Sequence, residues 1–194
     1  MNLATVMSMR PTRWSILGFL LVAAISAEAA DVRRYALADH GALTLAVPDG
    51  WRDKVESPGP NLPPTITFFP ASSRGFQVLV TPIWPFKADI PKPSPESVRE
   101  SVRRAADSVK SQVVEPELKI EEFKGPETYA SFFSATDRAP KPGEYKYMTQ
   151  GMMGLDDLRV TFTILTNEGR NDIVPRALNM LMDARRERGG GLAR

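Results

Sequence analysis

The segment from residue 145 to residue 167, YKYMTQGMMGLDDLRVTFTILTN, constrains the fold of this chain more than any other part. Both arms alternate with a period of two, and the second arm carries an apolar face formed by Leu158, Val160, Phe162 and Ile164. Such alternation of β-branched and aromatic residues with polar ones is typical of half-buried strands. The stretch Gly154-Leu155-Asp156-Asp157 between the arms is rich in turn formers. The segment therefore predicts a long antiparallel hairpin. Because an isolated hairpin is marginal in water, other elements must cover its apolar face.

Shorter segments of the same kind supply the remaining strands. Three further pairs are expected, each joined by a short turn: residues 33–37 with 42–47, 65–69 with 76–83, and 118–124 with 128–137. Residues 52–64 contain Ser57-Pro58-Gly59-Pro60 and Pro63-Pro64, and we expect them to be loop. Trp51 follows the Pro48-Asp49-Gly50 turn, and we expect its ring to anchor the edge of the core.

Two amphipathic helices complete the predicted elements. Ser94 is a good N-cap before Pro95, and an apolar stripe follows it at Val98, Val102, Ala105, Val109 and Val113 until Pro116 stops the helix. Asn171 or Asp172 caps the second helix, whose stripe is Ile173, Ala177, Leu181 and Ala184 and whose basic end is Arg185, Arg186 and Arg188. Strands joined by tight turns together with two helices favour one α+β domain, residues 30–188, with an antiparallel sheet sandwiched between helices.

The N-terminus indicates export. Arg10 and Arg13 precede an apolar run from Trp14 to Ile25, and Ala27-Glu28-Ala29 fits a cleavage site, so residues 1–29 are expected to be a signal peptide. The alternative is an uncleaved membrane anchor, but the run is shorter than the ~20 residues that a spanning helix needs. We therefore expect a periplasmic or secreted protein with no membrane contact after processing, and a flexible tail at residues 189–194.

Composition removes several classes of chemistry. The chain has no cysteine and one histidine, which excludes thiolate nucleophiles and cysteine or histidine-rich metal sites. A formal net charge of +2 gives no reason to expect binding to nucleic acid. No motif for a serine hydrolase or a phosphate loop is present, so we predict no catalytic residue, no metal ligand and no cofactor.

Three remaining features have both a functional and a structural interpretation. His40 could be a metal ligand or a general base, but it sits in an expected turn with no second histidine. Asp156 and Asp157 could hold calcium, but adjacent turn residues diverge. The methionines at 148, 152 and 153 could bind Cu(I), although methionine fills cores far more often. We favour the structural interpretation for all three.

The sequence also resembles a known family. A strand pair that ends in Leu45-Ala46-Val47-Pro48-Asp49-Gly50-Trp51, followed by strands, a long helix, more strands and a C-terminal helix, is similar to PsbP-like domains. The resemblance covers about residues 32–187 and includes exported bacterial members of unassigned role. It implies an antiparallel sheet between helices and a non-enzymatic accessory or binding role. It carries over no catalytic residue, and the residues that PsbP uses for metal or photosystem contact have no recognisable match here.

Two hypotheses about function remain. The first is an exported, non-enzymatic binding or assembly accessory domain whose protein partner or small ligand is not identified. Its binding residues would be Trp84, Tyr145 and Tyr147, on a sheet face left partly open beside the Pro-rich loop 85–93, because Tyr and Trp are enriched where partners dock. The alternative is a periplasmic carrier of a small ligand or metal, or an enzyme that uses carboxylates and tyrosines in a pocket between sheet and helix. The sequence leaves the oligomeric state open.

Overall fold

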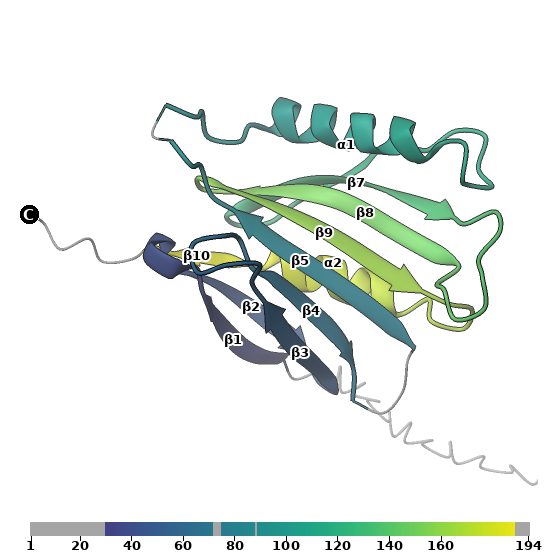
Figure 1. The fold of residues 1–194 in the computed structure, drawn as a ribbon, viewed down its shortest axis with the longest axis horizontal. Helices are drawn as coiled ribbons and strands as arrows, with labels where there is room; N and C mark the ends of the chain where they lie inside the picture. Colours follow the sequence, from purple (N-terminus) through teal and green to yellow (C-terminus); the bar gives the residue numbers. More distant parts are fainter. Residues whose placement is uncertain (1–29, 72–74, 88, 189–194) are drawn as a thin grey trace, which may run out of the picture.

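A seven-stranded antiparallel sheet forms the centre of the computed structural model, which describes residues 30–71, 75–87 and 89–188 (Figure 1). The order of its strands is β3-β4-β5-β9-β8-β7-β6. Their bounds are β3 (Trp51–Glu56), β4 (Thr65–Pro70), β5 (Phe76–Ile83), β6 (Glu121–Lys124), β7 (Thr128–Thr136), β8 (Tyr147–Leu155) and β9 (Leu158–Thr166). The predicted signal peptide at 1–29 and the predicted tail at 189–194 lie outside the described residues.

The hairpin predicted from residues 145–167 is confirmed as β8 and β9. Leu155 pairs with Leu158, so Asp156 and Asp157 alone make the turn, and Asp156 takes a positive φ of 54°. A positive φ at the first turn residue suits the right-handed twist of a tight hairpin, and Asp tolerates it better than most residues. The predicted apolar face of the second arm is buried throughout its length.

A second, three-stranded sheet packs behind the large one together with a helix. It contains β1 (Ala30–Ala36), β2 (Ala42–Pro48) and β10 (Arg185–Glu187) in the order β1-β2-β10, with a short 3₁₀ helix, η1 (Ala38–His40), between the first two strands. Helix α2 (Ile173–Met182) lies with this sheet on the same side of the large sheet (Figure 1). Buried residues of both sheets and of α2 form one core.

The prediction for the basic C-terminal residues is wrong. Arg185 and Arg186 do not end the second helix, because α2 stops at Met182 and the chain then pairs with the free edge of β2, placing Arg186 opposite Leu43. That edge offers unpaired backbone groups, and pairing satisfies those of the C-terminal segment. The core is therefore closed on one side by a helix and a small sheet, where the sequence predicted a helix alone.

The prediction that residues 52–64 are loop is also wrong for its first part. Residues 51–56 form β3, the edge strand of the large sheet, and pair with β4 from Trp51–Pro70 to Glu56–Thr65. The segment lacks the apolar alternation of a strand because an edge strand buries little, and pairing with β4 supplies the missing stability. Trp51 is buried as predicted, with its ring centroid 4.6 Å from that of Phe76.

Helix α1 (Pro95–Val109) covers the other side of the large sheet. Ser94 is its N-cap, as predicted, and exchanges hydrogen bonds with Ser97 in a capping box. The helix ends at Val109 and does not continue to Val113, which forms an isolated bridge with Asp137 instead. None of the helices in the described ranges is long and apolar enough to cross a membrane.

Candidate functional site

Helix α1 covers only one half of its side of the large sheet. It packs on β7 and β8, where Val102 and Ala106 contact a small core that includes Phe133 and Ala135. A helix is about 10 Å wide, and strands are about 4.8 Å apart, so one helix covers about two strands. Figure 1 shows α1 along the β7 and β8 part of the sheet, away from β3 and β4. The same side of β9, β5, β4 and β3 carries no helix among the described residues.

We call this uncovered half the open sheet face. The register defines its members: Phe133 under α1 lies opposite Gln150, and the same row continues through Thr163, Leu79 and Thr67. Side chains two residues away along each strand share this side of the sheet. The open sheet face consists of Arg52, Lys54 and Glu56 on β3; Thr65, Thr67 and Phe69 on β4; Gln77, Leu79 and Thr81 on β5; and Thr161, Thr163 and Leu165 on β9.

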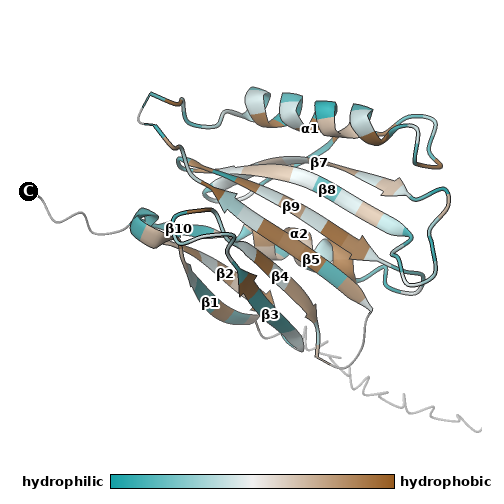
Figure 2. Cartoon of the chain, in the orientation of Figure 1, coloured by the Kyte–Doolittle hydropathy of each residue, from teal (hydrophilic) through white to brown (hydrophobic). Residues whose placement is uncertain are grey.

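The open sheet face mixes apolar and hydroxyl-bearing side chains. Leu79, Phe69 and Leu165 are half-buried and lie among threonines. The surface is therefore of mixed polarity, less apolar than a core and less charged than most exposed surfaces. The hydroxyls of Thr65 and Thr81 are hydrogen-bonded at 2.8 Å across β4 and β5. Figure 2 shows both hydrophobic and hydrophilic residues along β5. A surface of this kind can bind a partner that brings both apolar groups and hydrogen-bonding groups.

A shallow cleft of about 470 Å³ lies at one end of the open sheet face. Its lining residues come from β3, β4, β5 and the loop before β8: Lys54, Glu56, Thr67, Phe69, Phe76, Gln77, Gly143 and Tyr145. Lys54 and Glu56 form an ion pair of 2.7 Å between exposed side chains on the cleft's outer edge. The cleft offers aromatic surface, an amide and one ion pair, which suit binding, and no nucleophile next to a base.

The three predicted binding residues do not lie together. Trp84 follows the last residue of β5, whereas Tyr147 pairs with Thr166, which in turn faces the first residue of β5, Phe76. The two side chains are therefore at opposite ends of the sheet. Tyr145 lines the cleft of the open sheet face, but Tyr147 lines a separate pocket of about 260 Å³ that also contains Glu115 and Arg170. The expectation of one shared surface is wrong.

Trp84 is also not exposed. Only 3% of its surface is accessible, and its ring stacks on that of His40 with centroids 4.6 Å apart. This contact places the one histidine in the packing of η1 against the end of β5, as the structural interpretation of His40 expects. The ring of Trp84 is therefore part of the core and would have to leave it to reach a partner.

The methionines have the predicted core role. Met153 is fully buried in the larger core, and Met148 and Met152 pack against the small core under α1. Met152 and Met153 thus point to opposite faces of β8, as strand alternation requires. No group of three His, Asp or Glu side chains within the described ranges is arranged to hold a metal ion.

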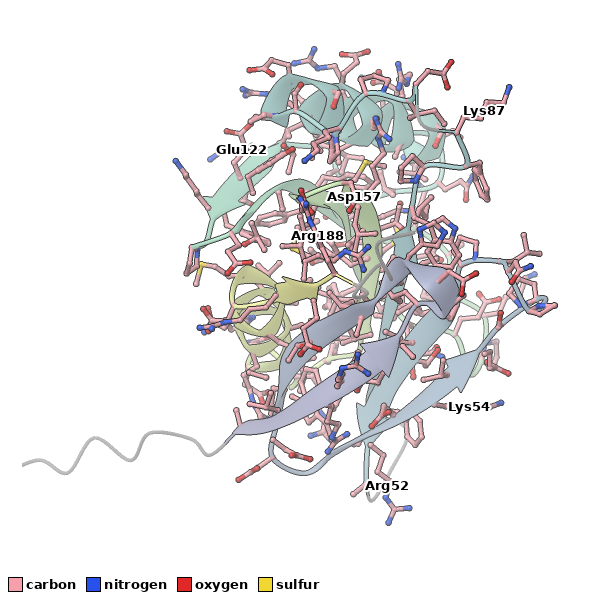
Figure 3. The ribbon with its side chains drawn as sticks, turned by 90° about the vertical axis from the view of Figure 1, so that its left-hand side faces the viewer. Arg52, Lys54, Lys87, Glu122, Asp157 and Arg188 are labelled. Carbon is pink, nitrogen blue, oxygen red and sulfur yellow. The ribbon has the colours of Figure 1, made fainter. Side chains whose placement is uncertain are left out.

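Asp156 and Asp157 take part in a charged cluster at the turn between β8 and β9. Asp156 forms ion pairs of 2.8 Å with Lys92 and 2.6 Å with Arg188. The hydrogen bond from Lys92, followed by burial in the opposite sense and by Arg188, leaves the pKa of Asp156 lowered. Arg186, whose side chain is 5% exposed, faces Asp157 at 3.5 Å. Figure 3 shows Asp157 and Arg188 near each other in this part of the molecule.

We call Lys92, Asp156, Asp157, Arg186 and Arg188 the charged clasp. It joins the loop before α1, the hairpin of the large sheet and the end of β10 in the small sheet. Every ion pair in the charged clasp connects segments that are distant in sequence, so the clasp can stabilise the tertiary structure. The clasp therefore explains the adjacent carboxylates without calcium.

Comparisons with known proteins find a similar fold and no close relative. No family model and no curated protein matches the chain. The solution structure of cyanobacterial PsbP (CyanoP) from Synechocystis sp. PCC 6803 matches 91% of this chain and 98% of its own length at 13% identity, with a TM-score of 0.50. A crystal structure from Bacteroides thetaiotaomicron VPI-5482 matches 76% of this chain at 10% identity with a TM-score of 0.40, and the match spans 46% of that protein.

The CyanoP match confirms the fold class predicted from the sequence. At 13% identity it shows the fold alone: an α+β domain of the PsbP-like kind, with mostly antiparallel sheets and two helices. Sequence reasoning expected a partly open sheet face but did not locate it on β3, β4, β5 and β9, although one signal was available. The second arm of the hairpin places Arg159, Thr161 and Thr163 opposite its apolar face, and such a polar face predicts a surface that α1 leaves uncovered.

Proposed function

We propose that this chain is an exported, non-enzymatic accessory domain that binds a protein partner on its open sheet face. The observation that carries this proposal is the half-covered sheet, in which α1 protects β7 and β8 while the same side of the next four strands stays accessible. Exposed surfaces that combine apolar and polar groups, such as the one around Leu79, are the kind that partners bury. The PsbP-like fold supports an accessory role, because the family that the sequence resembles is non-enzymatic.

The chemistry of the open sheet face supports binding over catalysis. Its hydroxyl groups belong to threonines, and none of the described residues around them is a histidine. General-base activation of a hydroxyl requires a base within hydrogen-bond reach. The one carboxylate on the face, Glu56, is an exposed group paired with Lys54. We therefore assign no reaction to this surface.

The N-terminal sequence pattern supports export. Arg10 and Arg13 precede the apolar run from Trp14 to Ile25, and Ala27-Glu28-Ala29 fits a cleavage site. The proposal therefore places the folded domain in the periplasm or outside the cell, without its leader.

A small-ligand carrier is the second candidate, and one observation favours it. The cleft beside Tyr145 has a volume of about 470 Å³, which falls within the range of about 300–1,000 Å³ that small-molecule sites occupy. Its shallow shape and its continuity with the open sheet face agree better with part of a larger docking surface. Native mass spectrometry of the protein from its own cells separates the two, because a carrier would retain a bound small molecule.

Site-specific photo-cross-linking tests the proposed function. A photoreactive amino acid replaces Leu79 or Thr163 on the open sheet face, and Val114, which is 57% exposed on a loop, serves as the control position. We expect the same protein adduct from the first two positions and none from the control. Absence of a shared adduct, or an equal adduct from Val114, would contradict a protein-docking role for this face.

A further inference from the structure

The space beside α1 on the large sheet has the width of one more helix. Helices that pack side by side have axes about 8–10 Å apart. Since α1 rests over β7 and β8, a neighbour two strands away, at about 4.8 Å for each strand, would rest over β9 and β5. Those two strands carry Leu79, Thr163 and Leu165 on this side. A second helix packed beside α1 would therefore lie on the β9 and β5 part of the open sheet face.

The flank of α1 that borders this space is lined by small side chains. Its other flank, with Arg99, Arg103 and Lys110, faces residues 117–120 near the β6 edge of the sheet. The helical period then places the residues that remain beside the buried stripe on the side of β9 and β5. These are Ser97, Ser101, Ala105 and Ser108. Small residues let a neighbouring helix approach closely, whereas the arginines of the far flank would hold it away.

Two cations on the rim of this space have no ion-pair partner among the described residues. Arg52 on β3 and Lys87 in the loop after β5 are exposed and take part in no ion pair between described residues. Figure 3 shows Lys54 and Lys87 projecting on the same side of the molecule, below and above the open sheet face. A partner with acidic flanks would complement this rim.

The edge of the sheet is less suited to an added strand. Arg33 of the small sheet donates a hydrogen bond of 3.1 Å to the carbonyl oxygen of Trp51 and pairs with Asp53, so it covers the start of β3. The rest of β3 carries exposed charged side chains, which oppose edge-to-edge pairing. An added strand would therefore meet charged side chains along this edge, whereas a helix needs only the face.

We infer that the partner contributes an acidic amphipathic helix, which lies beside α1 over β9 and β5 and completes the helical layer. This inference rests on the proposed function. The apolar side of the helix would cover Leu79 and Leu165, its polar groups would meet the threonines, and its acidic flanks would face Arg52 and Lys87. A helix of about 15 residues, the length of α1, would span the strands beneath it.

Selection from two displayed peptide libraries tests the inference with the whole mature chain as bait. One library presents helices of about 15 residues with randomised faces, and the other presents linear peptides interrupted by proline, which cannot form helices. We expect enrichment from the helical library alone, in clones with an apolar stripe and net negative charge. Synthetic copies should bind the Leu79→Arg variant at least about tenfold more weakly than the parent.

Charge reversal supplies the matched control. Lys87→Glu should weaken the selected helices several-fold at low salt, whereas Lys110→Glu, the same change on the far flank of α1, should leave their affinity unchanged. Enrichment of linear clones whose binding depends on Leu79 would contradict a helical partner but would still support docking on the open sheet face. Absence of Leu79-dependent clones from both libraries would count against the docking face as well. Self-association that Leu79→Arg abolishes would replace the helical partner with a second copy.

Discussion

The two halves of the large sheet on the α1 side share one set of strand pairings but differ in what lies above them. Under α1, Phe133 and Ala135 are buried with Val102 and Ala106 in a small core. Along the same row of paired residues, Leu79 and Thr163 remain half-exposed, and Thr67 is 8% exposed with no helix over it. The difference shows that α1 covers β7 and β8, whereas no described helix covers β9, β5, β4 and β3 on this side. Stability should therefore depend on the covered half, and recognition on the open half.

The largest effect is expected in the covered half. Phe133→Ala removes a fully buried ring from beneath α1 and leaves a cavity, which should lower the free energy of unfolding by about 3–5 kcal/mol. Chemical denaturation followed by circular dichroism measures the change. A loss below about 1 kcal/mol would show that the small core under α1 contributes little to the free energy of unfolding. It would contradict the view that stability depends on the covered half of the sheet.

Substitution of Trp84 tests whether this residue belongs to the core or to the open sheet face. Trp84→Ala should destabilise the chain by about 3–5 kcal/mol, since the ring is buried and stacked on His40. Tyr145→Ala, a change of another large aromatic residue that is only half-buried in the cleft, should cost much less. Thermal melts of both variants measure the difference. If the two variants melt alike, Trp84 is not part of the core and regains its place as a candidate binding residue.

The charged clasp should give a smaller, pH-dependent effect. Asp156→Asn keeps a residue that tolerates the positive φ of the turn but loses the ion pairs with Lys92 and Arg188, at a cost of about 1 kcal/mol at pH 7. Because the pKa of Asp156 is lowered, chiefly by Lys92, the parent loses this stability as pH falls through the lowered value. The difference between parent and variant should therefore shrink below the ordinary range of an aspartate.

Urea denaturation at a series of pH values measures that difference. Asp107→Asn is the control, because Asp107 is exposed and pairs with Lys110 only at 3.7 Å, so its loss should change stability little at any pH. A constant gap between parent and Asp156→Asn down to strongly acidic pH would show that the clasp does not act through charge.

The smallest effect on stability is expected in the open half. Leu79→Thr copies the neighbouring Thr67, Thr81 and Thr163 and should change the free energy of unfolding by no more than about 0.5–1 kcal/mol. The same variant should lose the photo-cross-linked partner from the Thr163 position. A variant that unfolds readily would show Leu79 to be structural, and one that retains the partner would remove it from the docking surface.

The sequence predicts those parts of the fold whose pattern is local. Alternation along residues 145–167 is sufficient for β8 and β9, and the Pro48-Asp49-Gly50 turn is sufficient to bury Trp51. The edge strand β3 and the strand β10 escape prediction because their charged sequences carry no alternation. Both exist through partners supplied by distant segments, β4 for one and β2 for the other.

The candidate site was less accessible to sequence reasoning. The partial opening of a sheet face was expected, but its position depends on which strands α1 covers, and no periodicity within α1 fixes that choice. Trp84 was expected on a binding surface because Tyr and Trp are enriched where partners dock, yet the ring of His40 from a distant turn stacks on it. Tyr145 is the one predicted binding residue that lines the open sheet face, and its role there stays a prediction.

The pairing of β10 with β2 has a consequence for how the chain can fold. Thr44 and Glu187 are hydrogen-bonded although they are 143 residues apart, and they join the last strand to nearly the first. The small sheet therefore cannot close until β10 has emerged from the ribosome, long after β2. Contacts of such long sequence separation slow folding, which leaves a newly made chain extended for longer. Under the export that we propose, such a delay would help, because an unfolded chain can pass a translocation channel before β10 closes the small sheet.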